Sequence, residues 1–388
     1  MHQRNRRQRW IWLAGPLIAL LAAVTTAPGA AASEVSSRPR TSASFDADVY
    51  AVAYRGNVVY VGGRFKGARS GSASTERSRV AAVDARSGRL LSWAPRTDGA
   101  VQAIVVYGES VYLAGDFTRV NDEPRRGLAK VDAATGALDP SFAPAVTGRA
   151  LALALGHGRL YVGGAFTAVN GEPRSNLAAV SPTTGALDAS WRPAATEGDV
   201  RAIAVDSSRA YLAGRFDMLN GSDDHRKLAA VHPTTGATDT GFRTRLSVIA
   251  RDVALGPGGP YAAIGGQGGQ LLALNSDGTA RWAVTANGDF QAVAVLGETI
   301  YAGGHFSEIC KTSRTGDQGV CLDGSTPRGR LAAVTAGGGL LGWAPEANSA
   351  IGVHAVATSG GLGTVAIGGA FTTLGSGSIE QPYFAYFT

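Results

Sequence analysis

The stretch Val59-Tyr-Val-Gly-Gly-Arg-Phe65 returns along the chain at near-regular intervals and decides the fold. Its copies end on phenylalanines at positions 65, 117, 166, 216, 306 and, more loosely, 371, and Tyr261–Gly266 is a degenerate copy in the one double-length gap. A Leu-Ala-x-Val-Asp-x-x-Thr-Gly run (Leu128–Gly136 is one), a single Trp or Phe, and an alternating Val-x-Ala-Val-Ala run recur with it. The chain is therefore a tandem repeat with a unit of about 50 residues.

Each unit holds four short stretches with period-2 alternation and β-branched residues, separated by Gly, Asn-Gly or Asp-x-x-Thr-Gly turns. Residues 33–388 show no sustained 3.6-residue period, which excludes a helical repeat. Such units are typical of β-propellers. We expect an all-β, seven-bladed β-propeller over residues 41–388, with four antiparallel strands per blade.

The strand count predicts how the ring closes. The first strand of the unit occurs seven times, but the aromatic fourth strand follows it only six times, and residue 388 lies in a third strand. Thr41–Ala47, which contains Phe45, matches Asp139–Pro144, which contains Phe142. We expect this N-terminal segment to complete the last blade, because ring closure removes exposed strand edges.

Two sets of repeated residues favour structural roles. Paired glycines such as Gly62-Gly63 and Gly163-Gly164 are expected where backbones approach too closely for a side chain. An arginine recurs three positions before the Leu-Ala-x-Val strand, and a local salt bridge or a carbonyl bond in each blade is the simplest role for it. These arginines are Arg77, Arg125, Arg174 and Arg328, with Arg226 displaced by one.

The repeats resemble those of bacterial delta-60 repeat proteins and, more distantly, the Rax2-like propellers of fungal cortical polarity markers. The resemblance rests on Tyr112–Phe117, Asn170–Arg174 and Leu128–Gly136, whose counterparts repeat over residues 41–388. It implies a propeller and no defined activity. A weaker similarity runs to quinoprotein-like propellers, but the blades depart from that motif, so quinone binding is not carried over.

The first 32 residues indicate a signal peptide. Four arginines at positions 4, 6, 7 and 9 precede an apolar run over residues 10–24, and small residues lead to an Ala-x-Ala site with cleavage expected near Ala32. The run is shorter than the ~20 residues that span a bilayer, although a retained anchor is the alternative. Without this acid-free segment the net charge falls from +6 to 6 − 4 = +2, which argues against nucleic-acid binding. We expect a secreted protein with a flexible tail over residues 33–40.

The two cysteines, Cys310 and Cys321, predict a disulfide that pins a loop. Metal ligation is the alternative, but it needs further thiolates or histidines, and the loop contains none. We therefore expect no metal site.

The positions that vary among similar repeats indicate where a ligand binds. The second residue of the first strand is expected to face one mouth of the central channel. The seven copies carry Tyr50, Gln102, Leu151, Arg201, Arg251, Gln291 and His354. At the next position of the strand, Asp252 stands where the other copies have alanine. Asp199 and Asp289 lie in adjoining loops. These groups would suit a polar ligand such as a glycan; the alternative is a solvated tunnel lining that binds nothing.

No nucleophile elbow, zinc-protease motif or phosphate loop occurs in the sequence. We expect a non-enzymatic binding or scaffold module at the cell envelope or outside the cell, with a glycan or a protein partner, and we assign no catalytic residue and no cofactor. The expected protein is a monomer without membrane contact once the signal peptide is removed. The alternative is a secreted hydrolase or lyase acting on a polysaccharide, with Asp252 and His354 as acid and base.

Overall fold

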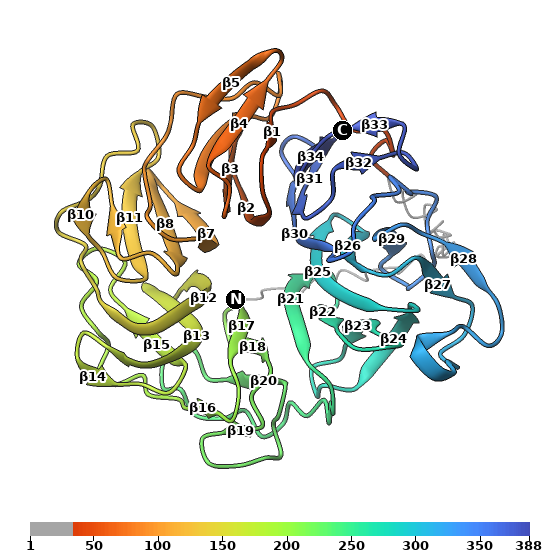
Figure 1. Ribbon diagram of the computed structural model, residues 1–388. Helices are drawn as coiled ribbons and strands as arrows, with labels where there is room; N and C mark the ends of the chain where they lie inside the picture. Colours follow the sequence, from red (N-terminus) through yellow and green to blue (C-terminus); the bar gives the residue numbers. More distant parts are fainter. Residues whose placement is uncertain (1–33) are drawn as a thin grey trace, which may run out of the picture. The chain divides into compact units, whose positions relative to one another are not determined.

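Each repeat folds into a short antiparallel sheet in the computed structural model, which describes residues 34–388 (Figure 1). The predicted signal peptide, residues 1–32, lies outside the described residues. The described part forms one compact unit. It contains no helix that is long and apolar enough to span a membrane.

The same three-strand pattern recurs in every repeat: a first strand pairs with the second, and the second pairs with the third. In chain order the sheets are β2 (Val49–Arg55), β3 (Val58–Gly63), β6 (Val80–Asp84); β7 (Val101–Tyr107), β8 (Ser110–Gly115), β11 (Leu128–Asp132); β12 (Val146–Gly156), β13 (Arg159–Val169), β15 (Leu177–Val180); β17 (Val200–Val205), β18 (Ala210–Gly214), β20 (Leu228–Val231); β21 (Ala250–Gly256), β22 (Gly259–Ile264), β23 (Gln270–Leu274), β24 (Ala280–Thr285); β25 (Asp289–Leu296), β26 (Thr299–His305), β29 (Leu331–Thr335); and β30 (Val353–Ser359), β31 (Thr364–Gly369), β34 (Phe384–Phe387).

Short additional strand pairs lie in the loops of most repeats. They are formed by β4 (Gly67–Ser70) and β5 (Ala73–Glu76), joined by β1 (Ser44–Phe45); β9 (Arg119–Val120) and β10 (Glu123–Pro124); β14 (Glu172–Pro173) on β13; β16 (Ala195–Thr196) and β19 (Met218–Leu219); β27 (Glu308–Cys310) and β28 (Ser325–Pro327); and β32 (Thr373–Leu374) and β33 (Ile379–Glu380). A 3₁₀ turn, Asp317–Gly319, lies between β27 and β28.

The first strands lie side by side around a common centre (Figure 1). β2 contacts β7, and the same contact repeats through β12, β17, β21, β25 and β30, while β30 also contacts β2. Each first strand therefore presents one face to the centre, and the second and third strands lie successively farther out. This arrangement is the propeller that the repeat predicts.

The core fills the wedges between neighbouring sheets. Tyr60 and Trp93 pack edge to face in one wedge with ring centroids 5.0 Å apart, and Tyr161 with Trp191 and Tyr301 with Trp343 do the same at 5.1 and 5.0 Å. Small Val and Ala side chains fill the rest of each wedge around these aromatic rings. Edge-to-face pairs of this kind add about 0.5–1.5 kcal/mol beyond their buried area.

The prediction of four strands per blade is wrong for most repeats. Only the β21–β24 sheet has its aromatic segment paired as a full fourth strand, among the sheets of residues 34–388. Elsewhere the segment makes a single bridge, for example Val83 with Leu90 and Val180 with Leu187. A proline follows two residues after the aromatic in four of these segments, at positions 95, 144, 193 and 345, and it has no N–H to donate to a ladder.

The recurring arginines hold these irregular segments through carbonyl bonds. Arg77 Nη2 donates to Leu91 O at 2.7 Å, and Arg328 Nη2 donates to Leu341 O at 2.7 Å. In the fourth repeat His225, not the displaced Arg226, occupies this position, and its Nδ1 lies 3.2 Å from Phe242 O. The expected carbonyl bond is confirmed, and a guanidinium or an imidazole can supply it.

The expectation of a flexible tail over residues 33–40 is wrong for its described part. Val35 is buried and its N–H donates to Tyr301 Oη at 3.1 Å. The Ser36 N–H donates to Thr388 O at 3.0 Å, and the Arg40 N–H donates to Tyr386 O at 2.9 Å. Backbone pairing with a buried strand fixes this segment, a result that its Ser, Pro and Arg content does not predict.

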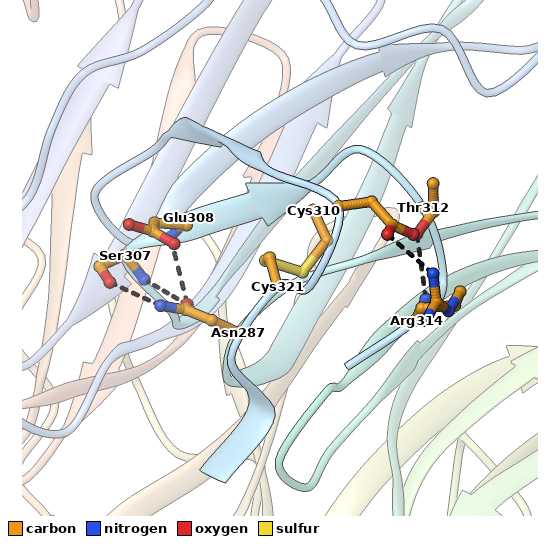
Figure 2. The surroundings of a disulfide bond; sticks show 8 residues. Asn287, Ser307, Glu308, Cys310, Thr312, Arg314 and Cys321 are labelled. Carbon is orange, nitrogen blue, oxygen red and sulfur yellow. Dashed lines mark hydrogen bonds and ion pairs between the residues drawn. A yellow bond between two sulfur atoms is a disulfide. The ribbon is translucent and has the colours of Figure 1, made fainter. Parts of the chain in front are cut away.

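The predicted disulfide joins Cys310 and Cys321, with Cα atoms 5.1 Å apart (Figure 2). The bond closes the base of the loop between β27 and β28, and Thr312 and Arg314 in this loop both bond Asp323. A double Cys310→Ser, Cys321→Ser variant should lose about 3 kcal/mol of unfolding free energy, the chain-entropy value for a loop of this size. Urea denaturation measures this loss; a change below about 0.5 kcal/mol would contradict a stabilising role.

Candidate functional site

A β-bulge near the start of every first strand builds the candidate site. In each sheet the pairing of the first and second strands shifts by one residue, as between Val49 and Ala51 or between Val353 and Ala355. The extra residue is unpaired, and a bulge re-aims its side chain. The bulged residues are Tyr50, Gln102, Leu151, Arg201, Arg251, Gln291 and His354.

The paired glycines allow these bulges to form. A Cβ on Gly164 would lie 2.0 Å from Arg149 O, the carbonyl just before the first strand turns into its bulge. Gly63 and Gly304 are equally close to Asp48 O and Asp289 O, with 2.1 Å in each case. The second glycine of the motif is thus needed for backbone approach, which confirms the sequence prediction and links the repeat signature to the site.

The seven bulged side chains line one cavity of about 440 Å³ at the channel mouth, together with Ile351. This cavity therefore contains every residue of the predicted mouth set except Asp252, which lines an adjoining hollow together with the same seven residues. A second, smaller hollow of about 200 Å³ adjoins this cavity and is lined by the same seven residues and by the residues that follow them, such as Ala51 and Ala103.

Asp252 lines this second hollow, in the place that alanine takes in the other repeats. Its Oδ1 accepts the Val253 N–H at 2.8 Å, and its Oδ2 accepts the Val293 N–H of the neighbouring strand β25 at 2.9 Å. Burial raises the pKa of Asp252 to about 6 despite these two bonds. Because both oxygens are engaged by backbone, the pairing of Asp252 with His354 as acid and base gains no support from the geometry.

The raised pKa gives a test of this carboxyl. The folded chain holds the Asp252 proton more tightly than the unfolded chain, whose carboxyl has the ordinary value of 3.8. The stability that it contributes is full below about pH 4 and is lost as the pH rises to about 6. Urea denaturation from pH 4 to pH 7 should show the wild type losing unfolding free energy relative to Asp252→Asn. Parallel pH profiles for the two proteins would contradict the raised pKa.

Carboxylates balance the positive charges of the arginines at the channel mouth. Arg201 bonds Asp199 through two nitrogens at 3.1 Å, and Arg215 bonds the same carboxylate at 2.8 Å. Arg251 Nη2 lies 2.6 Å from Asp289 Oδ2.

Two further ion pairs continue around the rim, formed by Arg64 with Asp48 at 3.0 Å and Arg149 with Asp116 at 2.7 Å. The sequence analysis missed both pairs. Their signal is present at two positions of the repeat, the residue before the first strand and the residue before the motif phenylalanine. Charged residues such as Asp48 and Arg64 occupy these positions in some repeats and uncharged residues occupy them in others.

His354 and Gln291 carry unused hydrogen-bonding capacity. Burial lowers the pKa of His354 below 6.5, so the imidazole is uncharged at pH 7. Its ring lies 5.7 Å from the ring of Tyr50. Gln291 Nε2 donates to Ile351 O at 3.0 Å. Within residues 34–388, His354 Nε2, Gln291 Oε1 and Arg251 Nε make no hydrogen bond. Buried polar atoms without partners are uncommon, and each costs free energy.

Comparisons with known proteins agree with the fold. A family model described as a domain of unknown function (DUF5122) β-propeller matches residues 110–142 and 158–190. No curated protein sequence matches the chain. The chain is similar to the computationally designed Ika8 protein, at 12% identity over 89% of this chain and 97% of that one, with a TM-score of 0.51.

The WD40 β-propeller domain of Doa1 is similar at 12% identity over 90% of this chain and 96% of that one, with a TM-score of 0.51. BamB from Moraxella catarrhalis matches at 16% identity over 88% of this chain and 83% of that one, with a TM-score of 0.48. The chain thus has an all-β propeller fold and contains matches to a β-propeller family model. At 12% identity and a TM-score of 0.51, the matches to Ika8 and to the Doa1 domain establish the fold alone.

Proposed function

We propose that the protein is an exported, non-enzymatic binding module that holds an uncharged glycan at the mouth of its central channel. The observation that carries the proposal is the convergence of seven bulged side chains on one cavity. A bulge repeated at the same position in every sheet, but filled with a different side chain each time, builds an asymmetric polar surface on a repetitive scaffold. Such a cavity, with few convergent polar groups, is the usual form of a ligand site.

The charge balance favours an uncharged ligand. Arg201 and Arg251 each lie against a carboxylate, and the His354 imidazole is neutral at pH 7. A polyanion would have to compete with Asp199 and Asp289 for the guanidinium groups. Sugar hydroxyls, in contrast, both donate and accept, and so can bond Gln291 Oε1 and the imidazole together. The half-buried ring of Tyr50 adds an apolar face beside these groups.

We further propose that the sheets are the seven blades of a closed ring and that the N-terminal segment completes the last blade. Two repeated contacts support this. Gln381 Nε2 donates to Ala43 O at 3.2 Å, two residues before Phe45, just as Arg77 bonds the carbonyl two residues before Trp93. The resemblance to delta-60 repeat proteins belongs to the same proposal.

The second contact comes from the tryptophans. Trp93 Nε1 donates to Asp132 O at the end of the next sheet's third strand. Trp343 Nε1 donates to Ser36 O at 3.2 Å, so the N-terminal segment occupies the corresponding place on the last sheet.

Calorimetric titration tests the glycan site. The purified protein is titrated with neutral oligosaccharides of the cello-, malto- and chito-series and with oligogalacturonates of equal length. We expect at least one neutral series to bind, and His354→Ala and Gln291→Ala each to weaken that binding at least 10-fold. The control variant is His157→Ala, in the turn between β12 and β13 at the opposite end of the strands.

A ligand at 100 times its Kd should also raise the unfolding free energy by about 2.7 kcal/mol. The proposal fails if no neutral glycan binds, or if binding is the same in the wild type and in both mouth variants. Failure with every glycan would leave the scaffold interpretation, with a protein partner.

A further inference from the structure

Beside the channel mouth, two loops of very different length fit together. The loop between β22 and β23, residues 265–269, is the shortest in its position, whereas the next sheet carries the long disulfide loop between β27 and β28. A Cβ on Gly319 would lie 2.7 Å from Gly268 N and 2.4 Å from Asn287 O. A Cβ on Gly268 would lie 2.9 Å from Thr315 Oγ1. The long loop therefore packs directly on the space that the short one leaves open.

Asn287 anchors the base of this arrangement (Figure 2). Its Oδ1 accepts the N–H groups of Ser307 and Glu308 at 2.9 and 3.1 Å, and its Nδ2 donates to Ser307 Oγ at 2.8 Å. With the Cys310–Cys321 disulfide close by, the start of the long loop is held by covalent and hydrogen bonds. A wall built in this way is pre-organised, which lowers the entropic cost of binding.

The two loops enclose a hollow of about 420 Å³. Gln267 from the short loop, His305 from the end of β26 and Gln318 from the long loop line it, and all three are exposed. Within residues 34–388 their side chains make no hydrogen bond or ion pair. They come from three separate segments, and no backbone feature of the fold requires them.

Asp289 joins this hollow to the channel mouth. It lines the hollow, and its ion pair with Arg251, which lines the mouth cavity, spans 2.6 Å. The two cavities are therefore neighbours separated by one ion pair.

We infer that the hollow lined by Gln267, His305 and Gln318 is a second saccharide subsite, so that the ligand is an extended oligosaccharide rather than a single sugar. This inference rests on the proposed function. Amide and imidazole groups present both donors and acceptors, as hydroxyl-rich chains require. Two neighbouring cavities that lie between the mouth and the disulfide loop suit a linear chain better than a compact ligand. The disulfide loop then acts as one wall of the binding groove.

The test compares ligand length by calorimetry on the purified protein. Disaccharides and hexasaccharides of the cello-, malto- and chito-series are the probes. In the series that binds, the hexasaccharide should bind at least 10-fold more tightly than the disaccharide. The double variant His305→Ala, Gln318→Gly should remove this difference and leave disaccharide affinity unchanged. Glycine suits position 318, because Gln318 has a φ of 57°. His157→Ala is the matched control and should bind both lengths as the wild type does.

The outcomes separate the two proposals. Loss of the length dependence in the double variant supports the second subsite. Equal affinity for both lengths in the wild type, or a length dependence that survives in the double variant, overturns the second subsite and leaves the mouth site standing. Absence of binding by every saccharide overturns the mouth site, and the second subsite with it. Because circular dichroism reports the fold of each variant, a misfolded variant is replaced by the single change Gln318→Gly, judged by the same criteria.

Discussion

A chain that begins at Asp48 should not fold cooperatively, although it keeps all seven first strands. The deletion removes Phe45, which is only 4% exposed and packs on Phe65 and Phe384 between the last sheet and the first. Truncating one buried phenylalanine to alanine already costs about 3–5 kcal/mol. The deletion also strips β34 of its partner segment and exposes an unpaired strand edge. These losses approach the whole stability of a typical domain.

Thermal and urea unfolding, followed by circular dichroism, check this prediction against the chain that begins at Ser33. The milder variant Phe45→Ala should fold but lose about 3–5 kcal/mol of unfolding free energy. A truncated protein with the wild-type midpoint would show that the N-terminal segment does not close the ring.

Gly164→Ala is expected to have the second largest effect. The added Cβ would lie 2.0 Å from Arg149 O, and both backbones belong to paired strands that cannot separate without breaking the bulge. Overpacking in a well-packed core costs about 1–3 kcal/mol, and we expect at least the upper value because backbone atoms cannot rotate away. The same bulge sets the position of Leu151, which lines the mouth cavity. The change should therefore alter this cavity as well as lower the unfolding free energy.

Gly360→Ala is the matched control. A Cβ there meets no atom within 4 Å, so its unfolding free energy should stay within about 0.5 kcal/mol of the wild type. Urea denaturation measures both variants. Equal stability of Gly164→Ala and Gly360→Ala would show that the glycine pair does not set the bulge.

The repeat pattern predicts much of this structure because the sequence features of each repeat have the same structural role in every sheet. Alternation within Val49–Arg55 and its counterparts predicts the first strands, and the variable second residue predicts the mouth set, because a bulge at a fixed repeat position acts the same way in each sheet. The glycine pairs and the carbonyl-bonding arginines are likewise repeated, so their structural roles can be inferred without coordinates.

The sequence predictions fail where contacts between residues far apart in the sequence determine the structure. Residues 34–40 have the composition of a tail, but contacts with residues far away in the sequence hold them in place, namely strand β34 and the side chains of Tyr301 and Trp343. The aromatic segments have the composition of strands, but most of them make only a single bridge to the third strand, as Leu90 does with Val83. Asp252 has the sequence position of a candidate catalytic carboxylate, but its Oδ2 accepts the Val293 N–H of the neighbouring strand β25. The hollow beside the disulfide loop depends on two loops from different repeats, and no sequence spacing predicts their fit.

The most direct test of the glycan site is the imidazole NMR spectrum of the protein during titration with the oligosaccharide that binds. Six histidines occur in the chain, and His354 and His305 lie at the mouth and in the adjoining hollow, whereas His157 and His232 lie in turns elsewhere. His354→Gln and His305→Gln assign the signals. We predict that the His354 signals shift first and most, that His305 shifts only with the longer chains, and that His157 and His232 stay unchanged. Saturating glycan that leaves the His354 signals unmoved would contradict a binding site at the channel mouth.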